Sequence, residues 1–290
     1  MSWRIVVVSN RSKLDYKLGY MVVRGEETTK IHLSEISILM IESTEVSLTA
    51  ALLSELTKSK VKVIFCDEKR NPSSELVSYY GCHDTSLKIR QQVKWSDSSK
   101  GSAWTEIVTE KIRKQRELLE KTGHDEAKLL TGYINEIEPN DLTNREGHAA
   151  KVYFNALFGM DFSRSLDIPT NSALNYGYTL ILSAVNREIV KSGYITQLGL
   201  FHDNVFNQFN LGSDIMEPFR PLVDRKVLEM QPSKFDRDEK MELVNILNST
   251  VYIDGKEQYV NNAIGIYCRS VFDAMNDNDM SLIRFYRNEL

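Results

Sequence analysis

The segment SAWTEIVTEKIRKQRELLEKTG, residues 102–123, decides the fold because it is the first long helical pattern in the chain. Its apolar residues recur every three or four positions and fall on one helical face. They are Trp104, Ile107, Val108, Ile112, Leu118 and Leu119. Gly123 follows, a residue type that commonly ends a helix in the left-handed conformation. The segment therefore predicts a long amphipathic helix.

Helical patterns continue from this segment to the end of the chain. They lie at 147–159, 172–193, 209–230, 238–253 and 260–276. Thr143 or Asn144 is placed to cap the first of them through a side-chain oxygen. Residues 85–290 are predicted to form an all-helical domain.

The residues before 85 have a different pattern. Short β-branched and apolar stretches lie at 3–9, 16–33, 36–43 and 61–67. A turn signal at 24–26 divides the second of them into two strands, and residues 71–74, which include Pro72, are a further turn signal. A single helical pattern, with Leu48, Leu52 and Leu56 on one face, lies at 47–60. We predict an α+β protein with a β-rich domain at 1–84 that contains one helix, followed by the helical domain at 85–290. Residues 78–88 form the joint.

Composition indicates an ordinary globular protein. The 290 residues are 42% hydrophobic and 26% charged, and no apolar run approaches the roughly 18 residues of a membrane span. The three cysteines show neither a paired spacing nor an even count, so a disulfide framework and a thiolate zinc site are not expected. We expect a cytoplasmic protein without a membrane partner.

The charge distribution gives a mixed indication about nucleic acid. A net charge of −4 is evidence against a surface coated in basic groups. Between positions 88 and 121, however, nine basic residues stand against five acidic ones. A local basic face of this kind can follow phosphates, and an equally good interpretation is a solvated helix face with ion pairs four residues apart. The candidate DNA contacts are Lys88, Arg90, Lys111, Arg113, Lys114 and, further along, Lys151.

Three segments carry residues that suit a metal site. Asp214 and Glu217 share a helical face in SDIMEPFRP, and two carboxylates side by side favour a hard cation between them. His202 follows an apolar stretch, in a segment where amides alternate with phenylalanines. Glu146 lies in the first turn of its predicted helix. Each also has an ordinary interpretation: an exposed acidic face, a hydrogen-bonded structural histidine, and a carboxylate that the helix dipole favours.

Taken together and in order, these segments resemble one family. The strings NREGHAAKVYF (144–154), QLGLFHDNVFNQFNL (197–211) and SDIMEPFRPLVD (213–224) resemble the CRISPR-associated integrase of spacer acquisition. HLSEIS (32–37), VIFCDEKRNP (63–72) and YGCHDTSLKIRQQ (80–92) extend the resemblance over nearly the whole chain. The sequences of NREGHAA, LNYGYTL and GSDIMEPFRP are similar to those of the branch that accompanies a single-protein, RNA-guided effector nuclease, the type II-A-like branch.

The resemblance implies a catalytic metal site. Its ligands would be Glu146, His202 and Glu217, holding Mg²⁺ or Mn²⁺, with Asp214 in a supporting role beside them. The implied activity is that of a metal-dependent endonuclease and integrase. The 3′-hydroxyl of a short foreign DNA fragment attacks a phosphodiester of the leader-proximal repeat, and one phosphodiester replaces another. No P-loop for a nucleotide triphosphate is present in the sequence, which agrees with such an exchange.

The resemblance also implies partners. They are the DNA fragment and the repeat array, a second copy of the chain that pairs through the N-terminal domain, and a small second CRISPR-associated subunit that bridges two dimers into a heterohexamer. The effector nuclease and an accessory adaptation protein complete the set.

Two other functions are alternatives to the integrase. A general metal-dependent nuclease would have the same three ligands and water as the nucleophile. A non-catalytic scaffold that only holds DNA would not depend on them.

Overall fold

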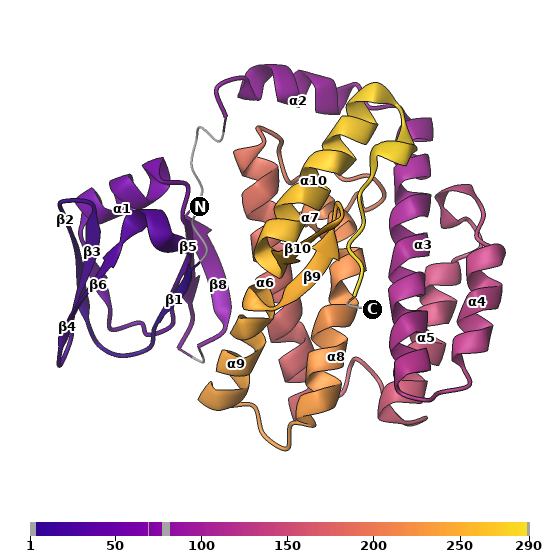
Figure 1. The fold of residues 1–290 in the computed structure, drawn as a ribbon, viewed down its shortest axis with the longest axis horizontal. Coiled ribbons are helices and arrows are strands. Elements are labelled where there is room, and N and C mark those ends of the chain that lie inside the picture. The colour runs from indigo at the N-terminus through magenta and orange to yellow at the C-terminus, as the bar shows by residue number, and fades with distance from the viewer. Residues whose placement is uncertain (1–3, 69, 77–81, 289–290) are drawn as a thin grey trace. The chain divides into compact units, whose positions relative to one another are not determined.

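The computed structural model describes residues 4–68, 70–76 and 82–288. Two compact units, Met1–His83 and Asp84–Leu290, divide the chain one residue before the predicted boundary. The first is built mainly from strands and the second mainly from helices, as the sequence predicted (Figure 1). Among the described residues, no helix is both long and apolar enough to cross a bilayer.

The described part of the N-terminal unit consists of two four-stranded sheets and one α-helix. One sheet has the order β1-β5-β7-β8 and the other the order β4-β3-β2-β6. The elements are β1 (Arg4–Val8), β2 (Lys13–Lys17), β3 (Tyr20–Arg24), β4 (Thr28–His32), a 3₁₀ turn (Leu33–Glu35), β5 (Ile36–Ile41), β6 (Ser47–Leu48), α1 (Ala50–Lys58), β7 (Lys62–Cys66) and β8 (Pro72–Leu76).

One apolar core holds this unit together. The inward residues of both sheets, such as Leu14, Met21 and Leu39, pack with Leu52 and Leu56 of α1. The predicted helix is confirmed over Ala50–Lys58, where Leu52 and Leu56 are buried, but Leu48 lies in strand β6 and not on the helix. Pro72, which we expected in a turn, begins the edge strand β8, where a missing N–H does not break the ladder.

The C-terminal unit is a bundle of helices with one small hairpin. Its elements are α2 (Thr85–Val93), α3 (Asp97–Lys121), α4 (Ala127–Asn135), a 3₁₀ turn (Pro139–Asp141), α5 (Arg145–Phe158), α6 (Pro169–Lys191), α7 (Asn210–Ile215), a 3₁₀ turn (Glu217–Phe219), α8 (Arg220–Met230), α9 (Arg237–Val244), a 3₁₀ turn (Asn245–Asn248), β9 (Thr250–Ile253), β10 (Lys256–Tyr259), α10 (Val260–Asp277) and a 3₁₀ turn (Met280–Leu282).

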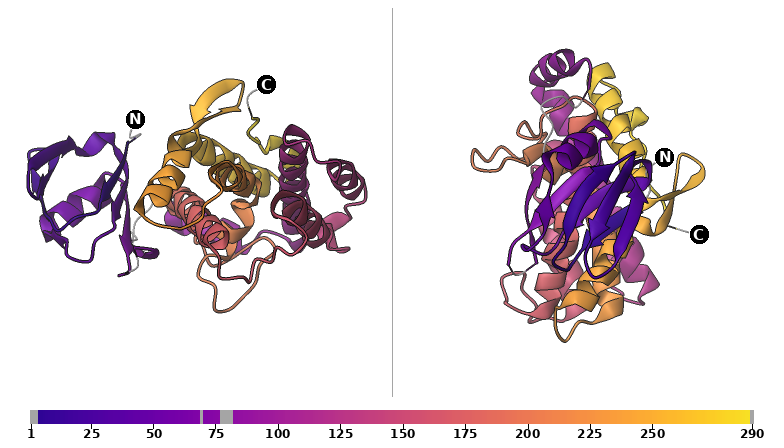
Figure 2. Two further views of the ribbon diagram at one scale, coloured as in Figure 1. Left: turned by 90° about the horizontal axis from the view of Figure 1, so that it is seen from below. Right: turned by 90° about the vertical axis from the view of Figure 1, so that its left-hand side faces the viewer.

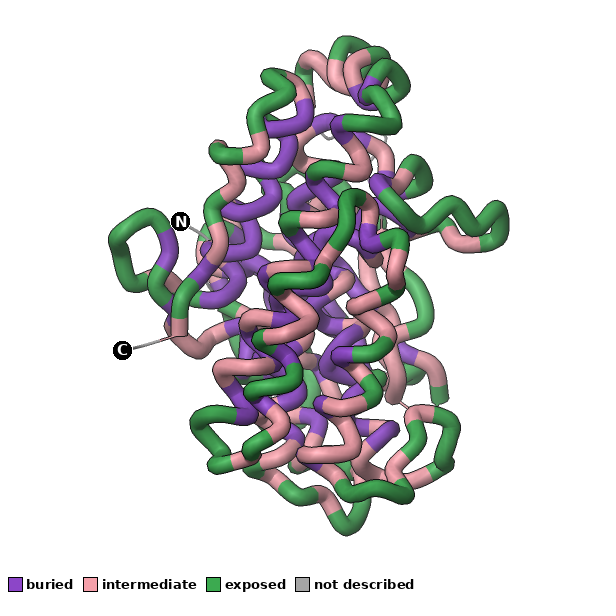
Figure 3. Tube along the Cα trace, turned by 90° about the vertical axis from the view of Figure 1, so that its right-hand side faces the viewer, coloured by how far each residue is buried: buried purple, intermediate pink, exposed green. Residues whose placement is uncertain are grey.

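Helix α3, the segment quoted first, is the axis of this unit. It contacts α4, α5, α8 and α10, and α6 in turn contacts α8, α9 and α10. Figure 2 shows these helices nearly end-on. Their buried positions follow the faces turned toward one another (Figure 3). Ile107, Val108 and Ile112 of α3 are completely buried.

Two predicted helices differ from the structure. The pattern at 209–230 is broken into α7, a 3₁₀ turn and α8, because Pro218 and Pro221 lack the N–H groups that a continuous helix needs. The pattern at 238–253 ends as helix at Val244 and continues into β9. Asp254 and Gly255 both have positive φ, 54° and 71°, and join β9 to β10 in a tight hairpin. The domain is therefore largely helical rather than all-helical.

Helices α6 and α8 approach closely at one glycine. A Cβ atom added to Gly177 would lie 2.4 Å from Cγ1 of Val223, which is itself buried. The close approach holds α8, and the 3₁₀ turn before it, against α6.

We predict that Gly177→Ala destabilises the protein by about 1–3 kcal/mol, because the added methyl group overpacks the α6–α8 contact. Val223→Ala removes the atoms that it would meet. The double variant Gly177→Ala/Val223→Ala should therefore be less destabilised than the sum of the two single variants. Urea unfolding of the four proteins measures this, and strictly additive losses would contradict the close contact.

Candidate metal centre

Two glutamates from different elements meet at one lysine. Glu146 lies in the first turn of α5, and Glu217 lies in the 3₁₀ turn between α7 and α8. A carboxylate oxygen of each contacts Nζ of Lys111, which projects from the middle of α3. Lys111 and Glu217 are buried, while the side chain of Glu146 is 29% exposed. The three elements thus bring two negative charges to one positive group.

The start of α5 is fixed by its own capping residues. The carboxylate of Asp141 accepts hydrogen bonds from the backbone N–H groups of Arg145 (2.7 Å) and Glu146 (3.0 Å). The side chain of Asn144 accepts one from Gly147 (3.3 Å). Of the two predicted caps, Asn144 is the one that the structure uses. These bonds satisfy N–H groups that a helix start leaves open and so hold the backbone that carries Glu146.

Glu217 is held by two cations. Its Oε1 pairs with Nε of Arg220 at 3.0 Å, and its Oε2 contacts Lys111. Burial opposes ionisation of Glu217, but the charges of Arg220 and Lys111 outweigh it and lower the pKa of the carboxyl below its usual value. Burial likewise acts to lower the pKa of Lys111, and Glu217 and Glu146 outweigh it and raise that pKa. Glu217, Lys111 and Arg220 are therefore charged at neutral pH.

Arg220 is itself oriented by a buried polar cluster. Its guanidinium lies over the ring of Tyr178, 4.7 Å from the centroid. The hydroxyls of Tyr178 and Tyr153 both donate to the carboxylate of Asp224, the latter at 2.9 Å. Burial raises the pKa of Asp224 to about 6, against the effect of the two hydroxyls. Helices α5, α6 and α8 are joined by these bonds directly behind the two glutamates.

His202 is oriented by Asp214. Its Nδ1 lies 2.5 Å from Oδ1 of Asp214, and the Asp214 carboxylate also accepts the backbone N–H groups of Leu200, Phe201 and His202 at 2.6, 3.0 and 3.2 Å. A carboxylate accepts from Nδ1–H, which leaves the lone pair of the neutral ring on Nε2. Asp214 is completely buried, while the His202 side chain is 43% exposed.

Close packing restricts this loop further. The ring of Phe201 stacks on Trp104 of α3 with centroids 4.5 Å apart, and the edge of His202 meets Trp104 at 5.7 Å. A Cβ atom at Gly199 would lie 2.3 Å from the backbone oxygen of His202 and 2.7 Å from Oδ2 of Asp214. Only glycine fits at that position without moving the loop.

The sequence paired Asp214 with Glu217 as neighbouring carboxylates, and the structure separates their roles. Asp214 turns to the His202 loop, and Glu217 turns to Lys111 and Arg220. The positive group that the structure shows between two carboxylates is the Lys111 ammonium, and it lies between Glu217 and Glu146. His202 and Glu217 still act electrostatically on each other's pKa, so the histidine is a neighbour of the pair.

The residues fit a divalent ion. Two carboxylates already share a cation, Lys111, at one point, and a histidine is held beside them with Nε2 available. Oxygen and imidazole donors suit Mg²⁺ and Mn²⁺. Within the described residues the ligand atoms of Glu146, His202 and Glu217 do not all lie within 4.8 Å of one another. Binding an ion would therefore draw them together and displace the ammonium group.

Two of the predicted DNA contacts are buried in this structure, and their contact with DNA stays a prediction. Lys111 and Lys114 are 6% and 3% exposed, because each ammonium group is buried against glutamates inside the bundle. Arg113 is paired with Glu110. Arg113 and Lys114 form intrahelical ion pairs, as in the alternative interpretation, whereas Lys111 pairs with glutamates of two other elements. Lys88 lies over the ring of Tyr194, and Arg90 and Lys151 are exposed, so contact with DNA at these three stays a prediction.

Aromatic residues near the site fall into two groups. Tyr176 and Tyr178 are buried in α6. Phe206, four positions after His202, is 92% exposed at the tip of its loop.

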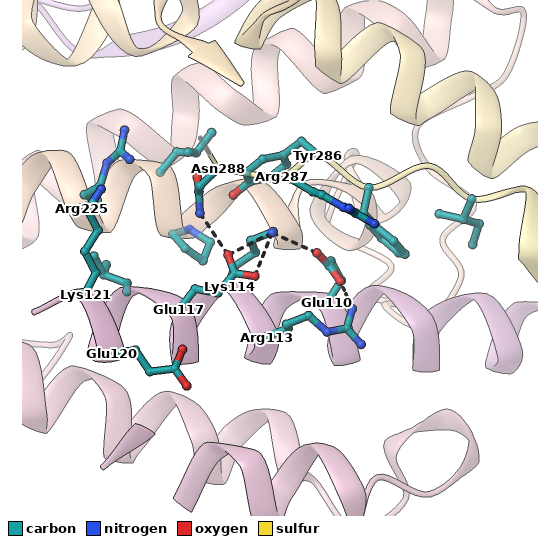
Figure 4. Close-up of a pocket in the computed structure, with 15 residues that line it drawn as sticks. Glu110, Arg113, Lys114, Glu117, Glu120, Lys121, Arg225, Tyr286, Arg287 and Asn288 are labelled. Atoms are coloured by element: carbon teal, nitrogen blue, oxygen red, sulfur yellow. Dashed lines mark hydrogen bonds and ion pairs between the residues drawn. The ribbon is translucent and has the colours of Figure 1, made fainter. Parts of the chain in front are cut away.

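A cavity of about 720 Å³ lies between α3, α8 and the C-terminal residues 283–288 (Figure 4). None of the three candidate ligands lines it. It contains Lys114, Glu110 and Glu117, which form an ion-pair cluster of their own.

The fold and the site define a two-unit α+β protein with a carboxylate–histidine centre between helices. The chain belongs to the family described as CRISPR associated protein Cas1, whose model matches residues 5–247. The resemblance read from the three motifs is thereby confirmed.

Individual known proteins are similar to this chain in sequence or in fold. The chain is 36% identical over 233 residues to the CRISPR-associated endonuclease Cas1 of Neisseria meningitidis serogroup C (strain 8013), covering 79% of this chain and 76% of the relative. A casposase bound to an integration product has a similar fold, with a TM-score of 0.77 at 17% identity over 96% of this chain and 91% of that one. A chain of a Cas6-RT-Cas1–Cas2 complex has a TM-score of 0.75 at 17% identity over 97% of this chain and 36% of that one.

We predict that His202 has a pKa above 6.5 in the metal-free protein. The hydrogen bond to Asp214 stabilises the imidazolium form and raises the pKa, and burial opposes it. Asp214→Asn should lower the pKa to 6.5 or below, because the charge is removed and the burial remains. Histidine ring resonances followed by NMR against pH measure both values. An equal pKa in the two proteins would show that Asp214 does not control the ring.

Proposed function

We propose that the protein is a metal-dependent DNA integrase of CRISPR adaptation. In this proposal it joins the 3′-hydroxyl ends of short foreign DNA fragments to the leader-proximal repeat. The observation that carries it is the convergence of Glu146 and Glu217 on one cation position with His202 beside them, in a chain of the Cas1 family. The relative named an endonuclease and the fold of a casposase both support chemistry on DNA phosphodiesters.

Such a site must stabilise negative charge at the reacting phosphate. A divalent ion held by Glu146, His202 and Glu217 supplies, when bound, a lower pKa for the attacking hydroxyl and positive charge near the phosphate. Arg220 fixes one oxygen of Glu217, so that the carboxylate presents the other. Asp214 keeps the lone pair of neutral His202 on Nε2. Neighbouring residues of the chain thus orient Glu217 and His202 before substrate arrives.

The reaction exchanges one ester for another. The oxygen of the fragment's 3′-hydroxyl forms a bond to a phosphorus of the repeat, and the bond from that phosphorus to the repeat's own 3′ oxygen breaks. The proton lost by the attacking hydroxyl is matched by the proton that the leaving hydroxyl gains. The number of phosphodiesters is unchanged, so no external energy source is required.

The proposed partners follow from the family and the fold. They are DNA, a second copy of this chain, and a small second subunit corresponding to the Cas2 of the Cas6-RT-Cas1–Cas2 complex. The heterohexamer, the effector nuclease and the accessory adaptation protein belong to the same proposal. So does the type II-A-like branch, which rests on the sequences of three motifs.

An integration assay separates this function from general nuclease activity. We predict that a plasmid incubated with a short duplex and Mg²⁺ or Mn²⁺ acquires covalently joined duplex. A duplex with 2′,3′-dideoxy ends should give no joined product, because it lacks the attacking oxygen. Equal nicking with both duplexes and no joining would indicate water as the nucleophile, and thus the nuclease alternative.

Substitution of the three ligands tests the site. We predict that Glu146→Ala, His202→Ala and Glu217→Ala each reduce joining by at least about a hundredfold, since each removes a donor around the reacting phosphate. Glu120→Ala, which removes an exposed carboxylate of α3, is the matched control and should join at the wild-type rate.

Circular dichroism establishes that each variant is folded. A folded ligand variant that joins DNA at the wild-type rate would show that the assigned site is wrong. Spacer acquisition that persists in cells with all three variants would support the DNA-holding scaffold.

A further inference from the structure

The ammonium group of Lys111 occupies the point where Glu146 and Glu217 meet. It contacts one oxygen of each carboxylate and is buried. We propose that the ammonium group of Lys111 occupies the position that the divalent ion would take and competes with that ion for it. Once displaced, the ammonium group pairs with a phosphate of the DNA. This inference rests on the proposed function, because it assumes that the same carboxylates take a metal ion.

The charges of the cluster show why competition follows. Two carboxylates, Glu146 and Glu217, face two cations, Lys111 and Arg220, so that the group as a whole is neutral. A divalent ion at the same point would leave a surplus of two positive charges in a largely buried place. Like charges this close repel strongly where water is scarce. The ion therefore binds weakly unless the ammonium group leaves.

Lys111 is able to leave because of its side chain and its surroundings. Lysine carries a compact charge on a flexible four-carbon stem. The neighbouring Glu146 side chain is partly open to solvent, whereas Glu217 is buried behind it. The open side is also the side from which a phosphodiester would approach. A displaced ammonium group would therefore meet the anion that restores neutrality.

The consequence is coupling between metal and DNA. DNA phosphate that pairs with the freed Lys111 removes the competitor, so DNA should increase the affinity for the metal. By thermodynamic linkage the metal increases the affinity for DNA by the same factor. A site of this kind holds its metal poorly until substrate is present.

Lys114 provides the comparison within the same helix. One turn along α3, it is buried to a similar degree and pairs with Glu110 at 3.3 Å and Glu117 at 3.1 Å (Figure 4). Its Nζ lies 4.9 Å from the centroid of the Tyr286 ring, and Asn288 donates to Glu117. Histidine does not line the cavity around this cluster. Lys114 thus belongs to a structural ion-pair cluster, and its burial and charge match those of Lys111.

Binding of Mn²⁺, followed by calorimetry and by the EPR signal of the free ion, tests the proposal. Lys111→Met should bind Mn²⁺ roughly tenfold more tightly than the wild type. Lys111→Arg keeps the positive charge and should not gain affinity, and Lys114→Met should bind as the wild type does. Addition of a short duplex should tighten binding in the wild type and have a smaller effect in Lys111→Met.

The outcomes distinguish failure of this inference from failure of the proposed function. Wild-type binding with no gain in Lys111→Met would overturn the role of Lys111 and leave the metal site intact. Absence of Mn²⁺ binding in every variant, with and without DNA, would overturn the metal site itself. An equal gain in Lys114→Met would show that any lost buried cation produces the effect, and would also overturn the inference.

A measurement on the unaltered protein keeps the test decisive if Lys111→Met does not fold. The side-chain NMR signals of Lys111 and Lys114 can be followed while Mg²⁺ and duplex are added. We expect the Lys111 signal to move and that of Lys114 to stay. A Lys111 signal that is unchanged at saturating Mg²⁺ and DNA would contradict its displacement.

Discussion

The repulsion between Glu146 and Glu217 is the constraint on which the rest of the helical unit depends. Two carboxylates whose oxygens reach one point inside a bundle need a positive charge there, and burial makes the need greater. Lys111 supplies it from α3, the helix that most of the other helices contact. Helix α3 therefore meets both requirements: its apolar face packs in the bundle, and its polar face supplies the charge that balances the site.

Several residues take no part in the chemistry but hold the three candidate ligands in place. Asp141 fixes the start of α5, Asp214 and Gly199 fix the His202 loop, and Arg220 fixes Glu217. The backbone is irregular at two of these points: Pro218 interrupts the helix that carries Glu217, and His202 lies in a loop. Regular helices on either side hold these irregular segments, which is how a site can combine buried charge with defined geometry.

Periodicity predicted most of the fold, and its failures have physical causes. The long helices and the β-rich first unit followed from apolar spacing, as with Leu52 and Leu56 of α1. The hairpin after Thr250 lies where apolar spacing predicted helix, although a β-branched run ending in Asp254–Gly255 is a turn signal. Similarly, Leu18 and Gly19, both with positive φ, turn β2 into β3 where one longer strand was expected.

The site was less accessible to sequence reasoning than the fold. The three ligands came from the family resemblance, since each alone had an ordinary explanation. Lys111 and Lys114 were counted as basic surface because a count of charges does not say which helical face a lysine takes. Arg220 stands in the same motif as Glu217, three positions on, a spacing that favours an ion pair and could have identified it. The role of Gly199 depends on contacts that only the folded loop creates.

The central claim is that Glu146, Glu217 and His202 share one divalent ion in the place that Lys111 holds. Anomalous diffraction from crystals soaked with Mn²⁺ and a short duplex tests it most directly. The account predicts one anomalous peak within bonding distance of both carboxylates and His202 Nε2, with the Lys111 ammonium group moved away. A peak elsewhere, or Lys111 still bridging the two glutamates at full Mn²⁺ occupancy, would contradict it.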